Sequence, residues 1–210
     1  MNLDHLGDVL DHWKGSVLTQ IRDKLMGLHV IPMFTDKDRW PADCLGAYAK
    51  LLRVELPQVL NELVPSGKDD RMGYFKEITQ GNCDLFLDPD TGISPESKCT
   101  KKHIEPEEIR DLLRKSPQRI LLIYQHRFRS KDPFREKLKQ LRRYLPTCYS
   151  FAYSAGPVAM VFISNCGQRI SDVYEYIFSL VGSVPKPRLV PGRMPNNRGR
   201  NRYGTIHLSQ

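Results

Sequence analysis

The sequence CDLFL at Cys83–Leu87 and the sequence RILLIY at Arg119–Tyr124 are two short apolar runs on either side of a helical segment. Short apolar runs bounded by turn residues are typical of buried strands. Between them, Glu105–Lys115 begins with Pro106 and two glutamates, as helix N-termini often do. Strand, helix and strand at this spacing predict a β-α-β unit and therefore a parallel sheet.

Apolar segments on both sides extend this unit. Tyr149–Tyr153 and Val158–Ser164 are joined by a link so short that it permits only an antiparallel pair. An amphipathic helix is expected at Asp8–Leu25, followed by a strand at Leu28–Thr35, where Pro32 indicates an edge position or a bulge. Further helices are expected at Asp43–Arg53, Pro57–Leu63, Asp70–Thr79, Pro133–Tyr144 and Ser171–Val181.

The predicted fold class is α/β: a three-layer sandwich whose mainly parallel sheet ends in a C-terminal antiparallel hairpin. The chain has 210 residues, which suits one such domain, and we expect it to span residues 1–181. Residues 182–210 contain no acid and four prolines. Such a segment buries too little apolar surface to fold alone, so it is predicted to be an extended or mobile basic tail.

The charge distribution favours an anionic partner. The formal net charge is +8, and twelve Lys or Arg face three acids between Arg110 and Arg143. Either these are solubilising charges on outer helix faces, or helix and tail together form a nucleic-acid surface. The candidate contacts of that surface are Arg127, Arg129, Arg142, Arg143, Arg198, Arg200 and Arg202.

The composition also excludes several classes of protein. The longest apolar stretches are too short to cross a bilayer, and Met1–Asp8 carries acids where a secretory signal has a basic region. The five cysteines are scattered, so a zinc site or a disulfide framework is not expected. We therefore expect a cytoplasmic protein without a membrane partner, and the sequence allows an oligomer.

The segment DPDTG at Asp88–Gly92 is the main candidate site, because it follows a predicted strand of the parallel sheet. Ligands of such sheets bind beyond the carboxyl ends of the strands. Asp88 and Asp90 there suit a hydrogen-bond acceptor, a general base or a metal ligand, although a tight turn with local hydrogen bonds explains them as well. His126 ends the next strand and is expected nearby, and Lys14 on the first helix is a further catalytic candidate.

A cofactor or metal is suggested by weaker patterns. Thr35 and Asp36 follow the first predicted strand, where an acid suits a ribose hydroxyl or an amino group, or caps the next turn. Pro89-Asp90 with Glu96-Ser97-Lys98 imitates the pattern of metal-dependent nucleases, but the spacing is short. The common glycine-rich phosphate loops and the hydrolase nucleophile elbow are absent from the sequence.

These residues resemble the class I, Rossmann-like methyltransferase fold. The DPDT loop at Asp88–Thr91 resembles the Asp-Pro-Pro-Tyr loop of amino-methyltransferases, and Tyr149–Ser164 looks like the terminal antiparallel pair of that fold. Gly7–Trp13 is similar to the helix before the cofactor strand in ribosomal-RNA adenine methyltransferases. The sequences DLFLDPDTG, Lys102-His103 and LIYQH at Leu122–His126 are more similar to a family of uncharacterised bacterial and phage proteins.

The resemblance covers roughly residues 8–181. It implies a protein that acts on or binds nucleic acid with S-adenosylmethionine, with Asp88 and the Pro89 carbonyl accepting hydrogen bonds from a target amino group. The sequence departs from the pattern in three places: Thr91 stands where an aromatic would stack, Asp90 replaces the second proline, and Phe34–Trp40 lacks the glycines of the cofactor loop. Two alternatives stay open: a nuclease that uses the Asp88/Asp90 loop and a divalent metal, and a non-catalytic nucleic-acid-binding or assembly protein.

Overall fold

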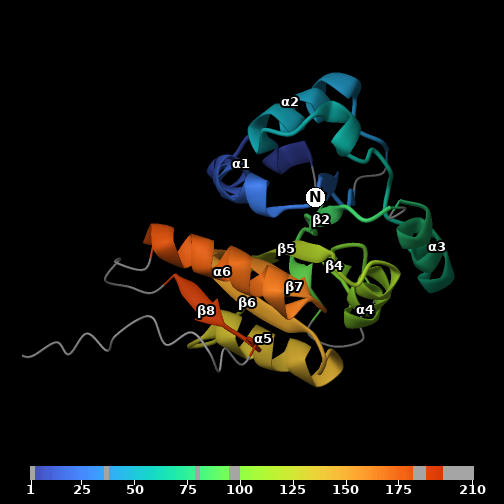
Figure 1. Cartoon of the computed structure of the whole chain (residues 1–210). Coiled ribbons are helices and arrows are strands. Elements are labelled where there is room, and N and C mark those ends of the chain that lie inside the picture. The colour runs from blue at the N-terminus through green and yellow to red at the C-terminus, as the bar shows by residue number, and fades with distance from the viewer. Residues whose placement is uncertain (1–2, 36–37, 79–80, 95–99, 182–187, 196–210) are drawn as a thin grey trace, which may run out of the picture.

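A computed structural model describes residues 3–35, 38–78, 81–94, 100–181 and 188–195. Among these residues, six strands form one mixed sheet in the order β1-β2-β5-β7-β6-β8 (Figure 1). The strands are β1 (Leu28–Ile31), β2 (Asp84–Leu87), β5 (Ile120–His126), β6 (Tyr149–Ala155), β7 (Val158–Ser164) and β8 (Leu189–Pro191), and a separate small sheet pairs β3 (Gly92–Ile93) with β4 (His103–Ile104).

Helices cover both faces of the sheet. They are α1 (Val9–Ile21), α2 (Ala42–Leu52), α3 (Lys68–Ile78), α4 (Pro106–Lys115), α5 (Pro133–Tyr144) and α6 (Gly167–Val181), with short 3-10 turns η1 (Leu3–His5), η2 (Arg22–Lys24) and η3 (Leu56–Gln58). No helix in the described part of the chain combines the length and the apolar character that a membrane crossing requires.

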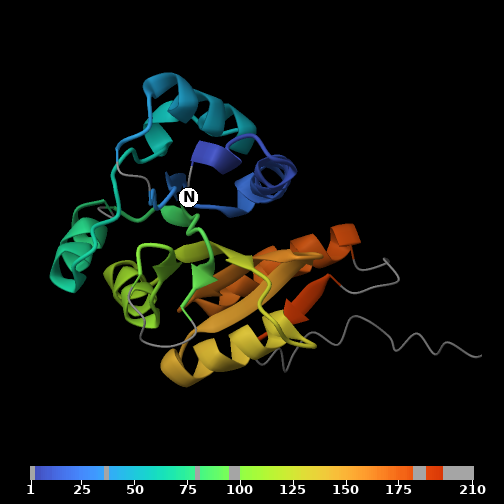
Figure 2. The same cartoon turned by 180° about the vertical axis from the view of Figure 1, so that it is seen from behind.

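The side chains of each strand alternate between two hydrophobic cores. Leu122 packs with α1, α2 and α6 on one face, whereas its neighbour Ile123 packs with α3, α4 and α5 on the other. Figures 1 and 2 show these two helical layers on either side of the strands. The predicted three-layer α/β arrangement is therefore confirmed.

The pairing within the sheet differs from the prediction. β1, β2 and β5 are parallel, with Val30 opposite Phe86 and Phe86 opposite Leu122. β7 and β6 form the predicted antiparallel hairpin, but β7 also pairs antiparallel with β5, and β8 pairs antiparallel with β6. Three of the five strand pairs are thus antiparallel, so the sheet is mixed and not mainly parallel.

The segment between α2 and α3 contains the clearest error in predicted secondary structure. Pro57–Leu63 is not a helix: it contains only the end of η3, and then Val59 and Leu63 form isolated bridges with Val30 and Phe34. β1 lies at the sheet edge, as Pro32 indicated, so its outer backbone groups are open to this extra pairing.

The predicted tail is partly integrated into the domain. Residues 182–187 and 196–210 lie outside the described part, but β8 between them is an edge strand of the sheet. Leu189 is buried there, and the amide of Ser154 donates to the Arg188 carbonyl at 2.8 Å. The packed sheet therefore extends beyond residue 181, because Leu189 belongs to one core and β8 pairs with the edge of β6.

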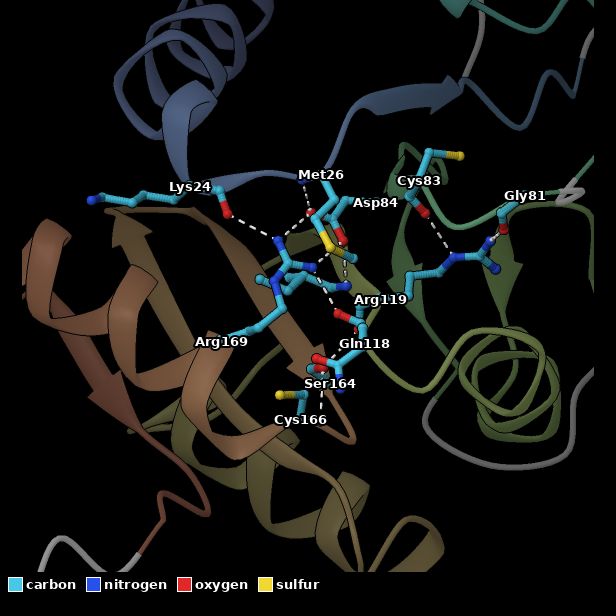
Figure 3. A network of polar contacts seen from close by, with 11 residues as sticks. Lys24, Met26, Gly81, Cys83, Asp84, Gln118, Arg119, Ser164, Cys166 and Arg169 are labelled. Carbon is cyan, nitrogen blue, oxygen red and sulfur yellow. Dashed lines mark hydrogen bonds and ion pairs between the residues drawn. The ribbon is translucent and has the colours of Figure 1, made fainter.

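A network at the amino ends of the parallel strands fixes their relative positions (Figure 3). The carboxylate of Asp84 accepts from the amides of Met26 (2.8 Å) and Ile120 (2.6 Å). Arg169 of α6 donates to both oxygens of Asp84 at 2.8 Å and reaches the Lys24 carbonyl at 2.9 Å. These groups bind one another, so the network holds the amino ends of the parallel strands together.

Candidate functional site

A pocket of about 550 Å³ opens at the carboxyl ends of β2 and β5, against the first turns of α1. This is the edge at which parallel α/β sheets bind ligands. The pocket is lined by His5, Asp8, Leu10, Asp11, Lys14, Asp88, Pro89, Asp90, Thr91, Lys102, Tyr124 and His126. Four of these side chains are carboxylates and two are lysines, so the pocket carries an excess of acid in a chain whose net charge is positive.

Helix α1 begins at the pocket because Asp8 caps it. The Oδ1 atom of Asp8 accepts from the amides of Leu10 (2.8 Å) and Asp11 (3.0 Å). Asp11 and Lys14 are three residues apart and therefore share one helix face, the face that also buries Leu18. The helix thus places a carboxylate and an ammonium group in its buried face.

A buried ion network forms the floor of the pocket. Lys14 Nζ lies 3.0 Å from Asp11 Oδ1 and 2.8 Å from Asp88 Oδ2, and these three residues are at most 4% exposed. The second oxygen of Asp11 accepts from the Gly7 amide at 2.9 Å. A buried charge is tolerated only when it is paired in this way.

Asp88 is held on one side and open on the other. The Tyr48 hydroxyl of α2 donates to the same oxygen as Lys14, Asp88 Oδ2, at 2.5 Å. The other oxygen, Oδ1, receives no hydrogen bond from the described residues, and Asp88 lines the pocket. Asp88 is therefore a fixed carboxylate with one acceptor atom available to a ligand.

The surroundings of Lys14 and Tyr48 fix the protonation states of these two side chains. Burial alone would lower the pKa of Lys14, but the carboxylates of Asp88 and Asp11 outweigh it and raise that pKa above its usual value. Burial raises the pKa of Asp11, an effect that Lys14 opposes. Burial, with Asp88 beside it, raises the pKa of the Tyr48 hydroxyl well above its usual value. Lys14 is therefore an ammonium ion and Tyr48 a neutral donor at physiological pH.

The loop that carries Asp90 is held against β5 by a glutamine. Gln125 Oε1 accepts from the Ile93 amide at 2.9 Å, and its Nε2 donates to the Thr91 carbonyl at 3.1 Å. Gly92 makes this approach feasible, since its φ is +106° and a Cβ there would lie 2.5 Å from the Gln125 side chain. Gln125 therefore fixes the position of this loop. The carboxylate of Asp90 also accepts a hydrogen bond from the Thr35 hydroxyl at 2.9 Å.

Two aromatic residues of β5 form the wall next to Asp88. Lys14 Nζ lies 4.2 Å from the centre of the Tyr124 ring, and His126 packs edge-on against the same ring with 4.9 Å between centres. Burial and then the charge of Lys14 lower the pKa of His126 below its usual value. Its imidazole is therefore neutral at pH 7 and has a nitrogen that can accept a proton.

The structure brings together all four side chains predicted as catalytic, because Lys14, Asp88, Asp90 and His126 line the same pocket. Their catalytic role stays a prediction. Of the two residues predicted to bind a cofactor, Thr35 donates a hydrogen bond to Asp90 but does not line the pocket. Asp36 lies outside the described residues.

The predicted basic surface is divided. Arg127 and Arg129 are exposed directly after His126, at the pocket end of the sheet. Arg142 and Arg143 are exposed in the last turn of α5, which leads back to the level of Ile120, where β6 begins. Helix α5 thus carries them to the opposite end of the sheet. The remaining candidates, Arg198, Arg200 and Arg202, lie outside the described residues.

The residues of the pocket fit neither a metal ion nor S-adenosylmethionine closely. Within the described part, no three His, Cys, Asp or Glu side chains are grouped to hold a metal, and Lys14 and Tyr48 already occupy Asp88 Oδ2. Glu96, the third acid of the nuclease pattern, lies outside the described residues. For S-adenosylmethionine, the segment after β1 has no glycine between Gly27 and Gly46 and does not line the pocket.

Several residues of the site were not predicted from the sequence, among them Asp11, Tyr48 and Tyr124, which surround Lys14 and Asp88. Asp11 could have been found, because an acid three residues before Lys14 on an otherwise apolar face indicates a buried pair. Tyr48 and Tyr124 gave no such signal, since a tyrosine in an apolar segment is usually part of the core.

Comparisons with known proteins give no assignment: the chain matches no family model, no curated protein and no solved structure. The chemistry of the pocket is therefore the basis on which a function can be proposed.

Proposed function

We propose that this pocket is the functional site of a methyltransferase-like α/β protein that acts on or binds nucleic acid, and that the group it binds is an amino-bearing base. The observation that carries the proposal is the available Oδ1 atom of Asp88 in a pocket with more carboxylates than ammonium groups.

The charge of the pocket favours an amino group over a phosphate. Asp8, Asp11, Asp88 and Asp90 would repel a phosphate group, whereas an ionised carboxylate accepts hydrogen bonds from N–H groups. Lys14 and Tyr48 fix the Asp88 carboxylate in one orientation, so that Oδ1 is positioned in advance for the incoming donor. The exocyclic amino groups of adenine, cytosine and guanine are donors of this kind in nucleic acid.

His126 provides a route for a proton. Any transfer of a group to an amino nitrogen replaces one N–H bond, so one proton must leave. The neutral imidazole of His126 lies in the wall of the same pocket and has a lowered pKa, which suits a proton acceptor near neutral pH. Asp88 would orient the amino group, and His126 would take up the released proton.

The exposed arginines after His126 would contact the backbone of the nucleic acid. Arg127 and Arg129 lie at the pocket end of the sheet, where phosphates flanking a bound base would come close. Contacts of this kind provide affinity without reading the sequence. The acidic pocket would then select the base, and Arg127 and Arg129 would bind the phosphate backbone of the nucleic acid.

The binding step can be tested by competition. A short single-stranded oligonucleotide containing all four bases is bound to the protein, and single nucleosides are added. Adenosine and cytidine should compete better than inosine and uridine, which carry a carbonyl in place of the amino group. Asp88→Asn should remove this preference, whereas Asp111→Asn on the exposed face of α4 should keep it. Equal competition by all four nucleosides would contradict the proposal.

The chemical step has its own measurement. The bound oligonucleotide is incubated with S-adenosylmethionine, or separately with magnesium or manganese, and its mass is determined. A gain of one methyl group that depends on His126 and Asp88 would identify a methyltransferase. Metal-dependent fragments would identify a nuclease instead, and an unchanged mass would identify a binding protein.

A further inference from the structure

The hydroxyl of Tyr124 is the feature of the pocket that the arrangement so far leaves unused. Tyr124 is 3% exposed and lines the pocket, yet its hydroxyl has no hydrogen-bond partner among the residues that the structure describes. Buried hydroxyl groups are almost always paired, because leaving one unpaired is costly. Within the described part, it is the one buried unpaired side-chain atom that belongs to a pocket-lining residue.

The ring of Tyr124 is fixed by its neighbours, so the hydroxyl cannot easily turn to another partner. Lys14 lies over one face of the ring and His126 packs against its edge. The side chain projects from β5, whose backbone pairs with β7 opposite Met160. The side chain of this pocket-lining residue is consequently held in place, and its hydroxyl is buried without a partner among the described residues.

From this arrangement, we infer that the Tyr124 hydroxyl donates a hydrogen bond to an acceptor atom of the bound base, next to the amino group that Asp88 holds. This inference rests on the proposed function. Burial, with the nearby carboxylate of Asp88 adding to it, raises the pKa of the hydroxyl, which therefore keeps its proton and can donate. An acceptor next to an amino group is the pattern of an unprotonated ring nitrogen beside an exocyclic amine, which adenine and cytosine present.

A contact with the ligand explains why the hydroxyl is retained in the pocket. Phenylalanine would keep the contact with Lys14 and the contact with His126, because both involve the ring. It would also remove an unpaired buried polar atom, which favours the fold. The contacts within the fold therefore do not require the hydroxyl, whereas an acceptor atom of a ligand would be its hydrogen-bond partner.

The test compares two tyrosines that share this property. Tyr74 on α3 also has a buried hydroxyl without a partner among the described residues, but it lies outside the pocket. Binding of the mixed-sequence single-stranded oligonucleotide is measured for Tyr124→Phe and Tyr74→Phe, together with the thermal midpoint of each variant. We expect Tyr124→Phe to weaken binding about tenfold, the effect of one hydrogen bond, and Tyr74→Phe to leave it unchanged.

The outcomes separate this inference from the proposed function. Both variants should melt at or above the wild-type temperature. Wild-type affinity in Tyr124→Phe, with Asp88→Asn still impaired, would overturn the role of Tyr124 alone. Weaker binding together with a lower melting temperature would also overturn it, because the hydroxyl would then support the fold. A wild-type protein that shows no preference for amino-bearing bases would overturn both.

Discussion

Lys14 Nζ lies 2.8 Å from Asp88 Oδ2, and this buried ion pair joins the first helix to the end of the second strand across 74 residues of sequence. It determines how the pocket is built: the helix supplies the cation, the sheet supplies the carboxylate, and Tyr48 of α2 holds the same oxygen. The site is therefore assembled only when α1 and α2 pack on the sheet.

Removing the ammonium group should destabilise the fold. Lys14→Met leaves Asp11 and Asp88 close together and buried without a counter-charge, a change that typically costs about 3 kcal/mol or more. We expect a loss of about this size in the free energy of unfolding, measured with urea, and a loss of oligonucleotide binding. The double variant Lys14→Met/Asp88→Asn should recover part of the stability, since it removes one of the two unpaired carboxylates.

The control for Lys14 is an ion pair on the surface. Arg135 of α5 lies 2.8 Å from Asp132, the residue that caps this helix, and both side chains are more than half exposed. Arg135→Met should change the free energy of unfolding by less than about 1 kcal/mol, because water screens the pair. If Lys14→Met and Arg135→Met lower the free energy of unfolding equally, the buried ion pairs of Lys14 stabilise the fold no more than an exposed pair does.

Close packing of the first two helices is a second requirement of the site. A Cβ at Gly15 would lie 2.0 Å from the Leu51 carbonyl oxygen of α2, whereas a Cβ at Gly46 of α2 meets nothing within 4 Å. Gly15→Ala should therefore cost about 2 kcal/mol or more by forcing the helices apart. Gly46→Ala should stabilise the protein by about 0.5–1 kcal/mol, because alanine is the better helix former.

The same glycine pair has a functional readout. Gly15 follows Lys14, so a displaced helix moves the ammonium group away from Asp88. Oligonucleotide binding should fall in Gly15→Ala and persist in Gly46→Ala at a temperature where both are folded. If Gly15→Ala is as stable as the wild type, the close helix contact is not required.

The strands and helices followed from local patterns in the sequence. Pro133–Tyr144 and Val158–Ser164 have the predicted bounds, because proline starts the one and an apolar run defines the other. The errors arise where pairing between distant segments determines the local structure. Val59 and Leu63, in the segment Pro57–Leu63, form bridges next to the sheet edge, and β8 pairs with β6. A sheet edge recruits such segments through backbone hydrogen bonds, which leave no periodic pattern in the sequence.

The site was predictable to the extent that sheet topology determined it. Asp88 and His126 end adjacent parallel strands, so their shared pocket followed from a β-α-β unit. The orientation of Lys14 did not follow, because a lysine beside Trp13 suits the surface equally well. Only the packing of α1 against the sheet buries it between two carboxylates.

The lowered pKa of His126 predicts a pH dependence of stability. The unfolded chain, with a pKa near 6.5, takes up the proton more readily than the folded protein, in which burial lowers the pKa. The contribution of His126 is therefore fully present above about pH 6.5 and is lost as the pH falls through the folded pKa. The free energy of unfolding should rise between about pH 5 and 7.

His103 must be separated from this effect, because burial and the charge of Lys137 lower its pKa as well. The comparison uses His126→Gln and His103→Gln, each of which should flatten part of the slope. The proton-dependent part of oligonucleotide binding should follow His126 alone. An unchanged slope in His126→Gln would contradict the shift proposed for its imidazole.

Two C-terminal truncations test how the last residues contribute. Removing 182–210 deletes β8, and with it the buried Leu189 and the ladder to β6, so the free energy of unfolding should fall by about 1–3 kcal/mol. Removing only 196–210 keeps β8 and deletes Arg198, Arg200 and Arg202. If these arginines contact phosphates, the shorter truncation should reduce the slope of log affinity against log salt by about 2–3 while leaving the unfolding free energy unchanged. A salt slope equal to that of the full chain would exclude Arg198, Arg200 and Arg202 as phosphate contacts and place the electrostatic contacts in the part of the chain that the shorter truncation retains.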